Sequence, residues 1–198
     1  MSARRQRQMC IRDRYINMAK RTIEGQDLGV LYDFDNDLGS FRFRYNASYT
    51  DKFDQIPTGQ FGVINDAQQS GLVPLYVNLG GFGNLLGIDG NYDEKHSMRL
   101  SWRKGPWGAS LSGLKKGSFI QSSLTLADGT EYVIPSMTTM DASIDYRFDL
   151  GGSDARLRFA VKNLEDERAP IADRFYGFFA DAHQDYGRNY YVSLKVNM

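Results

Sequence analysis

The sequence has 198 residues, with 24 basic and 24 acidic side chains, so its formal net charge is zero, and aromatic residues make up 13% of it. One domain is the default at this length, and no run of about 18 apolar residues is present that could form a transmembrane helix. Cys10 is the only cysteine. Disulfide, thiol-nucleophile and zinc-cysteine chemistry are therefore excluded for the rest of the chain.

The first 14 residues differ in character from those that follow. Residues 4–14 read as the translation of a transposon-end sequencing adapter, so we predict a non-native tail over 1–14 and leave it out of fold reasoning. A basic nucleic-acid arm or a targeting segment is the alternative, but no apolar segment or cleavage site follows. The tail holds five arginines and one aspartate, which leaves the remainder mildly acidic. That balance argues against a nucleic-acid partner.

From residue 22 onward, seven segments alternate between apolar and polar residues, the period of a strand with two different faces. They are 22–34, 40–50, 95–103, 107–115, 138–148, 155–164 and 190–198. In the second segment, aromatic residues from Phe41 to Tyr49 alternate with polar residues that include Arg42 and Arg44. The sequence therefore predicts an all-β fold, an antiparallel meander of about seven strands.

The connections between these segments are short and long in turn. The short ones are 35–39, 104–106 and 149–154, and the long ones are 51–94, 116–135 and 165–188. We expect a loop over 51–94 with a helical turn near 66–70, and a small hairpin around Asp128 and Gly129. Short periplasmic turns and long extracellular loops are typical of outer-membrane barrels. All three long loops are predicted at one end of the sheet.

The polar faces support the same interpretation. Arginines such as Arg42, Arg99 and Arg158 would be costly against lipid but natural beside a water-filled lumen. Aromatic residues near the strand ends, including Phe34 and Trp107, fit the interfacial belts of a membrane barrel. Alternation alone does not exclude a soluble sandwich, because that fold also pairs an apolar face with a polar one.

The end of the chain resembles the end of TonB-dependent outer-membrane receptors. The residues that carry the resemblance are Val161-Lys162-Asn163-Leu164, Asp166, Pro170, Tyr186-Gly187-Arg188 and the alternating strand that follows. The resemblance implies that residues 15–198 are an incomplete portion of a barrel of about 22 strands, with the N-terminal plug domain absent. It also implies location in the bacterial outer membrane and active uptake of a scarce ligand, such as a ferric siderophore, cobalamin or an oligosaccharide.

The resemblance further implies partners and candidate site residues. The partners are outer-membrane lipid, a small-molecule ligand held by extracellular loops, and the TonB complex acting through the missing plug. The protein is then not an enzyme, and we expect no catalytic residues, no metal site and no cofactor. Aromatic and titratable groups in the first and last long loops are the candidate ligand contacts. They are Tyr76, Phe82, Phe175, Tyr176, Phe179 and His183.

Two other architectures remain open at this point. One is a complete eight-stranded outer-membrane barrel with a structural or adhesive role, which would need an eighth strand in residues 15–21. The other is a soluble carbohydrate-binding β-sandwich. If the strand count is seven, the first and last strands run in the same direction. Closing the sheet would then need a parallel pair, so we predict an open sheet.

Overall fold

The computed structural model describes residues 19–74 and 81–197. The chain divides into two compact units, one made of Met1–Arg21 and Gln55–Gly83, the other of Thr22–Asp54 and Asn84–Met198. The tail predicted over 1–14, the candidate ligand residue Tyr76 and the last residue Met198 lie outside the described residues.

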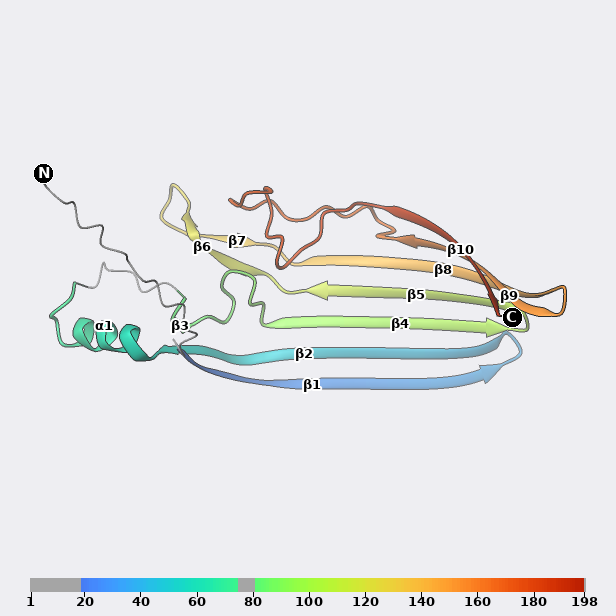
Figure 1. Cartoon of the computed structure of the whole chain (residues 1–198), viewed down its shortest axis with the longest axis horizontal. Coiled ribbons are helices and arrows are strands. Elements are labelled where there is room, and N and C mark those ends of the chain that lie inside the picture. The colour runs from blue at the N-terminus through green and yellow to red at the C-terminus, as the bar shows by residue number, and fades with distance from the viewer. Residues whose placement is uncertain (1–18, 75–80, 198) are drawn as a thin grey trace, which may run out of the picture. The chain divides into compact units, whose positions relative to one another are not determined.

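Strands side by side in one antiparallel meander make up most of the described chain (Figure 1). Their bounds are β1 Ala19–Asn36, β2 Gly39–Pro57, β4 Glu94–Lys104, β5 Trp107–Lys116, β8 Met137–Leu150, β9 Ser153–Lys162 and β10 Asn189–Asn197. The order across the sheet is β1-β2-β4-β5-β8-β9-β10, and the short β3, Gly83–Asn84, pairs with β2. The predicted antiparallel meander of about seven strands is confirmed, and the described residues are mostly β, with three further short strands and one helix.

The register between strands explains why the sheet keeps two distinct faces. Along one row, Phe43 lies opposite Leu100, which lies opposite Leu111, which lies opposite Ala142. In the next row, Arg42 lies opposite Ser101, and that row continues to polar residues on β5 and β8. Because paired residues point to the same side, the alternation within each strand becomes one apolar face and one polar face of the whole sheet.

The short turns lie together at one end of the sheet. Trp102 Nε1 donates a hydrogen bond to the carbonyl of Leu38 in the β1–β2 turn, at 2.7 Å. The backbone N–H of Arg147 donates to the carbonyl of Pro106 in the β4–β5 turn, at 2.9 Å. Asn197 pairs with Asp154 beside the β8–β9 turn, so β10 ends on this side too.

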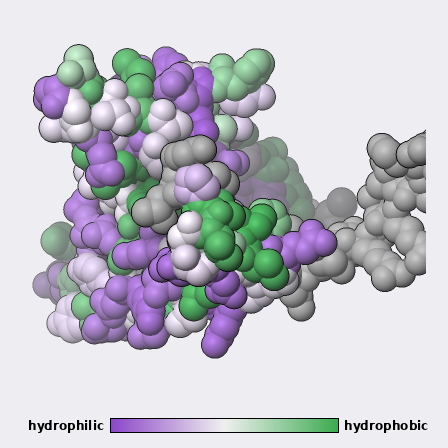
Figure 2. All heavy atoms as spheres, turned by 90° about the vertical axis from the view of Figure 1, so that its left-hand side faces the viewer, coloured by the Kyte–Doolittle hydropathy of each residue, from purple (hydrophilic) through white to green (hydrophobic). Residues whose placement is uncertain are grey.

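The parts of the long connections that belong to the unit Thr22–Asp54 and Asn84–Met198 meet at the other end of its sheet. Backbone hydrogen bonds join the segment before β4 to the hairpin of β6, Phe119–Thr125, and β7, Glu131–Ile134: Ile120 N–H donates to the Gly87 carbonyl at 2.7 Å. The hairpin is also bonded to the last long connection, because Asp173 N–H donates to Gln121 Oε1 at 3.0 Å. Figure 2 views this end and shows hydrophobic residues interspersed among hydrophilic ones.

In the unit made of Thr22–Asp54 and Asn84–Met198, the buried apolar core lies mainly among these connections. It contains Phe119, Ile134, Ala172, Phe179 and Ala182, and we call this cluster the loop core. Tyr92 and Tyr132 pack against it. The loops at this end therefore form a folded layer of their own.

The prediction of one irregular loop over 51–94 was wrong. Strand β2 continues to Pro57, and an eleven-residue helix, α1, spans Gly59–Gln69 in place of a single turn near 66–70. The strand continues beside β1, its neighbour in the sheet, and Lys52 forms an ion pair with Glu24 of β1 at 3.6 Å. Pro57 ends it, since proline has no N–H for a further ladder bond. No helix in the described part of the chain is long and apolar enough to cross a membrane.

Candidate functional site

The apolar face of the sheet is exposed. On it, Leu100, Ile144, Phe159 and Val192 have between 40% and 72% of their surface uncovered. A β-sandwich would bury such a face under a second sheet, whereas in the described residues the second sheet is only the β6–β7 hairpin. Hydrocarbon is the solvent that suits a face of this kind, so the arrangement favours a membrane wall over a sandwich.

Aromatic rings gather on this face near the short turns. The rings of Phe34 and Phe41 stack with centroids 4.8 Å apart, and those of Trp107 and Tyr146 are 4.6 Å apart. Phe148 continues the second group, 6.1 Å from Tyr146. Rings at the end of an apolar band are typical of the level at which a bilayer meets water.

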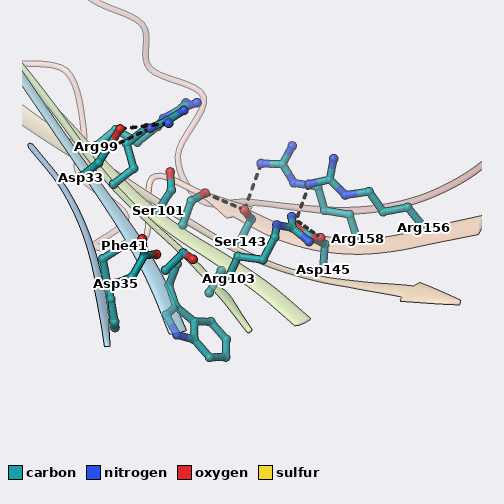
Figure 3. Close-up of a pocket in the computed structure, with 15 residues that line it drawn as sticks. Asp33, Asp35, Phe41, Arg99, Ser101, Arg103, Ser143, Asp145, Arg156 and Arg158 are labelled. Carbon is teal, nitrogen blue, oxygen red and sulfur yellow. Dashed lines mark hydrogen bonds and ion pairs between the residues drawn. The ribbon is translucent and has the colours of Figure 1, made fainter. Parts of the chain in front are cut away.

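The opposite, polar face holds a hollow of about 680 Å³ (Figure 3). Strands β1, β2, β4, β5, β8 and β9 contribute side chains to it. Its charged lining residues are Arg42, Arg99, Arg103, Arg156, Arg158, Asp33, Asp35 and Asp145. We call this feature the arginine hollow.

Asp145 is the centre of the charge network in the hollow. Only 6% of its surface is exposed, and its two carboxylate oxygens accept from Arg156 Nη2 at 2.7 Å and Arg103 Nη2 at 3.2 Å. A buried carboxylate is tolerated only when it is paired in this way. Gly108 lies between these groups, and a Cβ there would stand 2.7 Å from Arg103 Nη2 and 2.9 Å from Asp145 Oδ1. The glycine therefore leaves the space in which the pair forms.

The other arginines are held differently. Arg42 forms a two-pronged ion pair with Asp33, at 2.8 and 3.0 Å. Arg158 Nη2 donates instead to the hydroxyl of Ser143 at 3.0 Å, and Ser143 lies 2.9 Å from the Ser110 hydroxyl. The polar face was predicted from the alternation, but the hollow was not. Its hub joins Arg103 and Asp145, which are 42 positions apart, and only the register of β4, β5 and β8 reveals that they meet.

The structure separates the predicted ligand residues into different environments. Phe82 lies in the other unit and contacts Phe61, with ring centroids 5.5 Å apart. Phe175 and Tyr176 are exposed, at 93% and 68%, and their rings meet edge to face. Phe179 and His183 are buried in or against the loop core, so the last long connection presents two of its four candidates to solvent.

His183 has an unusual environment for a titratable group. It is 1% exposed, its ring stacks on Phe119 with centroids 5.7 Å apart, and neither ring nitrogen has a hydrogen-bond partner among the described residues. Burial lowers the pKa of His183, and the nearby Lys116 ammonium lowers it further. The imidazole is therefore held neutral beside the loop core.

Asp185, two residues further on, has the opposite character. The Arg168 guanidinium donates two hydrogen bonds to its carboxylate, at 2.7 and 2.6 Å, and Ala169 N–H donates a third at 2.9 Å. These bonds lower the pKa of Asp185 from 3.8 to about 2. In the described part of the chain, no three His, Cys, Asp or Glu side chains lie together as a metal site would require.

Taken with the register and the loop arrangement, the two unlike faces define a piece of wall from an outer-membrane β-barrel. Residues 3–164 match the family described as TonB dependent receptor-like, beta-barrel. Because the match covers most of the chain, the protein belongs to that family. Comparisons with curated proteins and with solved structures found no match.

Membership in this family makes the protein receptor-like and connects it with transport at the outer membrane. The family is one of transporters and not of enzymes. Contact with membrane lipid and with a ligand, and use of TonB, follow for the family in general.

Proposed function

We propose that the chain forms part of the wall of a receptor that actively takes up a scarce ligand across the bacterial outer membrane. The candidate ligands are a ferric siderophore, cobalamin or an oligosaccharide. The main support is a sheet with two faces suited to two solvents, with exposed residues such as Leu100 and Phe159 on one side and the arginine hollow on the other. A wall between lipid and water needs both.

The proposal includes a domain organisation. Residues 15–198 would be a C-terminal section of a barrel of about 22 strands, the plug would lie upstream, and residues 1–14 would be foreign. The open strand order supports this, since β1 and β10 each have a free side in the described sheet. Genomic sequence upstream of residue 15 tests it. More alternating strands and a plug are expected there, whereas a secretion signal directly before residue 15 would contradict it.

Uptake itself is tested in the native bacterium. Deletion of the receptor gene should abolish growth on one of the three ligand classes when that ligand is limiting. The intact gene should restore growth, and a gene without its plug should not. Unchanged uptake of all three classes in the deletion strain would refute the proposal.

Within the last long connection, we expect Phe175 and Tyr176 to touch the ligand, with Phe179 and His183 supporting them from the loop core. The two exposed rings form an edge-to-face pair with centroids 4.9 Å apart, which gives a flat or apolar ligand group a rigid surface. Replacing both with alanine should weaken ligand binding at least about tenfold, or about 1.4 kcal/mol.

A matched control is Tyr186→Ala, because Tyr186 is an exposed ring on the same connection and belongs to no edge-to-face pair among the described residues. It should leave the affinity unchanged. An equal loss in the control and in the double variant would mean that the connection is merely perturbed. No loss in the double variant would remove Phe175 and Tyr176 from the site.

A further inference from the structure

The charges of the arginine hollow do not balance. Five guanidinium groups line it, and three carboxylates accompany them: Asp33, Asp35 and Asp145. The Asp145 carboxylate forms ion pairs with two arginines, Arg103 and Arg156. Asp33 forms an ion pair with Arg42. Asp35 forms no ion pair with a described residue. The hollow therefore carries a net positive charge.

Two of the arginines have no acidic partner. Within residues 19–74 and 81–197, no carboxylate lies at ion-pair distance from Arg99 or Arg158, and Arg158 is bonded only to the Ser143 hydroxyl. In the Asp145 group, Arg103 Nη1 and Arg156 Nε are buried and have no hydrogen-bond partner in that part of the chain. Arg99 and Arg158 therefore have donors without a carboxylate partner on the lining of the hollow, whereas Arg103 Nη1 and Arg156 Nε are covered by the protein.

The type of cation narrows the ligand chemistry. The cations that line the hollow are all arginines and none is a lysine. A guanidinium is a planar fork that binds carboxylate and phosphate oxygens in pairs, which an ammonium cannot do. A volume of about 680 Å³ lies in the range of small-molecule pockets and is small for a protein segment. The arginines lie on neighbouring strands whose pairing is continuous, so their backbone positions are fixed before a ligand binds.

We propose that the arginine hollow binds a small, multiply charged anion that bears carboxylate or phosphate groups. Arg99 and Arg158 make the new ion pairs, and the positive charges of Arg103 and Arg156 on the same lining add to the attraction. The hollow lies near the short turns, which face the periplasm in outer-membrane barrels. As a step in uptake this site rests on the proposed function and restricts its ligand to the anionic classes. Binding itself can be measured without transport.

The test uses the full chain folded in detergent micelles, with inorganic pyrophosphate and succinate as probes and the neutral sugar maltose for comparison. Calorimetric titration should show saturable binding of both anions, weaker at higher salt, and no binding of maltose. Arg99→Gln combined with Arg158→Gln should lower the affinity for pyrophosphate at least tenfold. Circular dichroism should show unchanged strand content in the variant.

Lys162→Gln is the matched control, since Lys162 is a cation on the same strand as Arg158, four positions away and outside the hollow. It should bind pyrophosphate as the native chain does. Arg99→Lys with Arg158→Lys keeps both charges, and it should lose part of the affinity because the paired geometry is gone. This variant also serves if the glutamine variant does not fold.

Three results would overturn the proposal: unchanged affinity in both double variants, an equal loss in Lys162→Gln, or binding of an acidic peptide but of neither small anion. If the chain binds anions and the deletion strain shows no uptake defect, the anion site is supported and the proposed function is refuted. If the deletion strain loses uptake and the chain binds no anion, the proposed function is supported and the anion site is refuted.

Discussion

At the scale of single residues, His183 shows how the loop core is coupled to pH. Protonation would place a charge in an apolar cluster, beside Phe119 and facing the Lys116 ammonium, whose Nζ donates to the neighbouring Ala182 carbonyl. The other cation nearby, Arg174, lies over the Phe179 ring, 4.4 Å from its centroid. With no carboxylate bonded to the imidazole among the described residues, nothing offsets the added charge.

The first prediction concerns acidification. Because the pKa of His183 is lowered in the folded state, the unfolded chain binds a proton that the folded chain does not. The stability of the loop core should therefore be complete above about pH 6.5 and fall as the pH drops below that value. Hydrogen exchange of residues 117–136 and 163–188 at pH 7.5 and pH 5 measures this, when each rate is divided by the intrinsic exchange rate at the same pH. Lower protection factors are expected at pH 5.

His183→Phe is the informative variant, since a ring of similar shape can stack on Phe119 without a titrating nitrogen. In this variant the difference in protection factor between pH 7.5 and pH 5 should disappear. The Arg168–Asp185 pair does not confuse the measurement, because the pKa of Asp185 is about 2 and its contribution is lost only as the pH falls below 3.8. A native chain with equal protection factors at both pH values would contradict this account of His183.

At the scale of the strands, adjacent residues face different solvents. On β5, Leu111 lies opposite Leu100 and Ala142 in the middle of the apolar face. The next residue, Ser112, lies opposite Arg99 and Asp141 on the polar face. One step along the chain thus separates lipid from the wet side of the wall.

The second prediction uses this pair of positions. Leu111→Arg should destabilise the protein in lipid vesicles by about 2–4 kcal/mol, the cost of an arginine near the bilayer midplane. Ser112→Arg should change stability by no more than about 0.5 kcal/mol, since the new side chain meets water and its repulsion from Arg99 is offset by attraction to the Asp141 carboxylate. Urea unfolding of both variants in vesicles measures the difference. Equal costs for the two would show that the faces have been assigned wrongly.

The strands also show how far the sequence can be interpreted without coordinates. Alternation identified the strands because each face meets a different solvent, and this leaves a local signal in every strand. The extension of β2 over residues 51–57 has no such signal, because it depends on contact with β1, for example between Lys52 and Glu24. Helix α1 was missed beyond one turn because it contains two glycines and buries no residue, so neither propensity nor periodicity marks it.

The same reasoning applies to the sites. The polar face was predictable because its arginines occupy alternate positions in their strands. The arginine hollow was not, since it depends on which arginine lies beside which aspartate, and the register decides this. The burial of His183 could not be predicted from the sequence either. The hairpin and the last long connection form the loop core together, and no pattern within either one predicts that contact.

At the scale of the whole molecule, the seven long strands of the described sheet do not close into a barrel. The sheet has β1 at one edge and β10 at the other, and these strands do not pair within the described residues. Both run toward the short-turn end, so joining them would require a parallel pair. The prediction of an open sheet is confirmed. In the described sheet, the outer sides of β1 and β10 have no neighbouring strand. Lipid cannot satisfy the backbone N–H and C=O groups of such an edge, whereas another strand can.

The last prediction follows from those edges. In buffer without detergent, the chain should associate by edge pairing, and light scattering at micromolar concentration should show large particles. Val192 and Leu194 are exposed on β10, at 72% and 57%, and replacing both with lysine should reduce the association because charges block an edge.

In lipid vesicles the same double variant should be less stable, by about 2–4 kcal/mol for a lysine near the midplane. Asn197→Lys, on the polar face of β10 and opposite Asp154, should leave the lipid stability nearly unchanged and separates an effect of the apolar face from one of added charge. A native chain that stays monomeric and freely soluble without detergent would mean that the edges are protected and that the apolar face does not meet lipid.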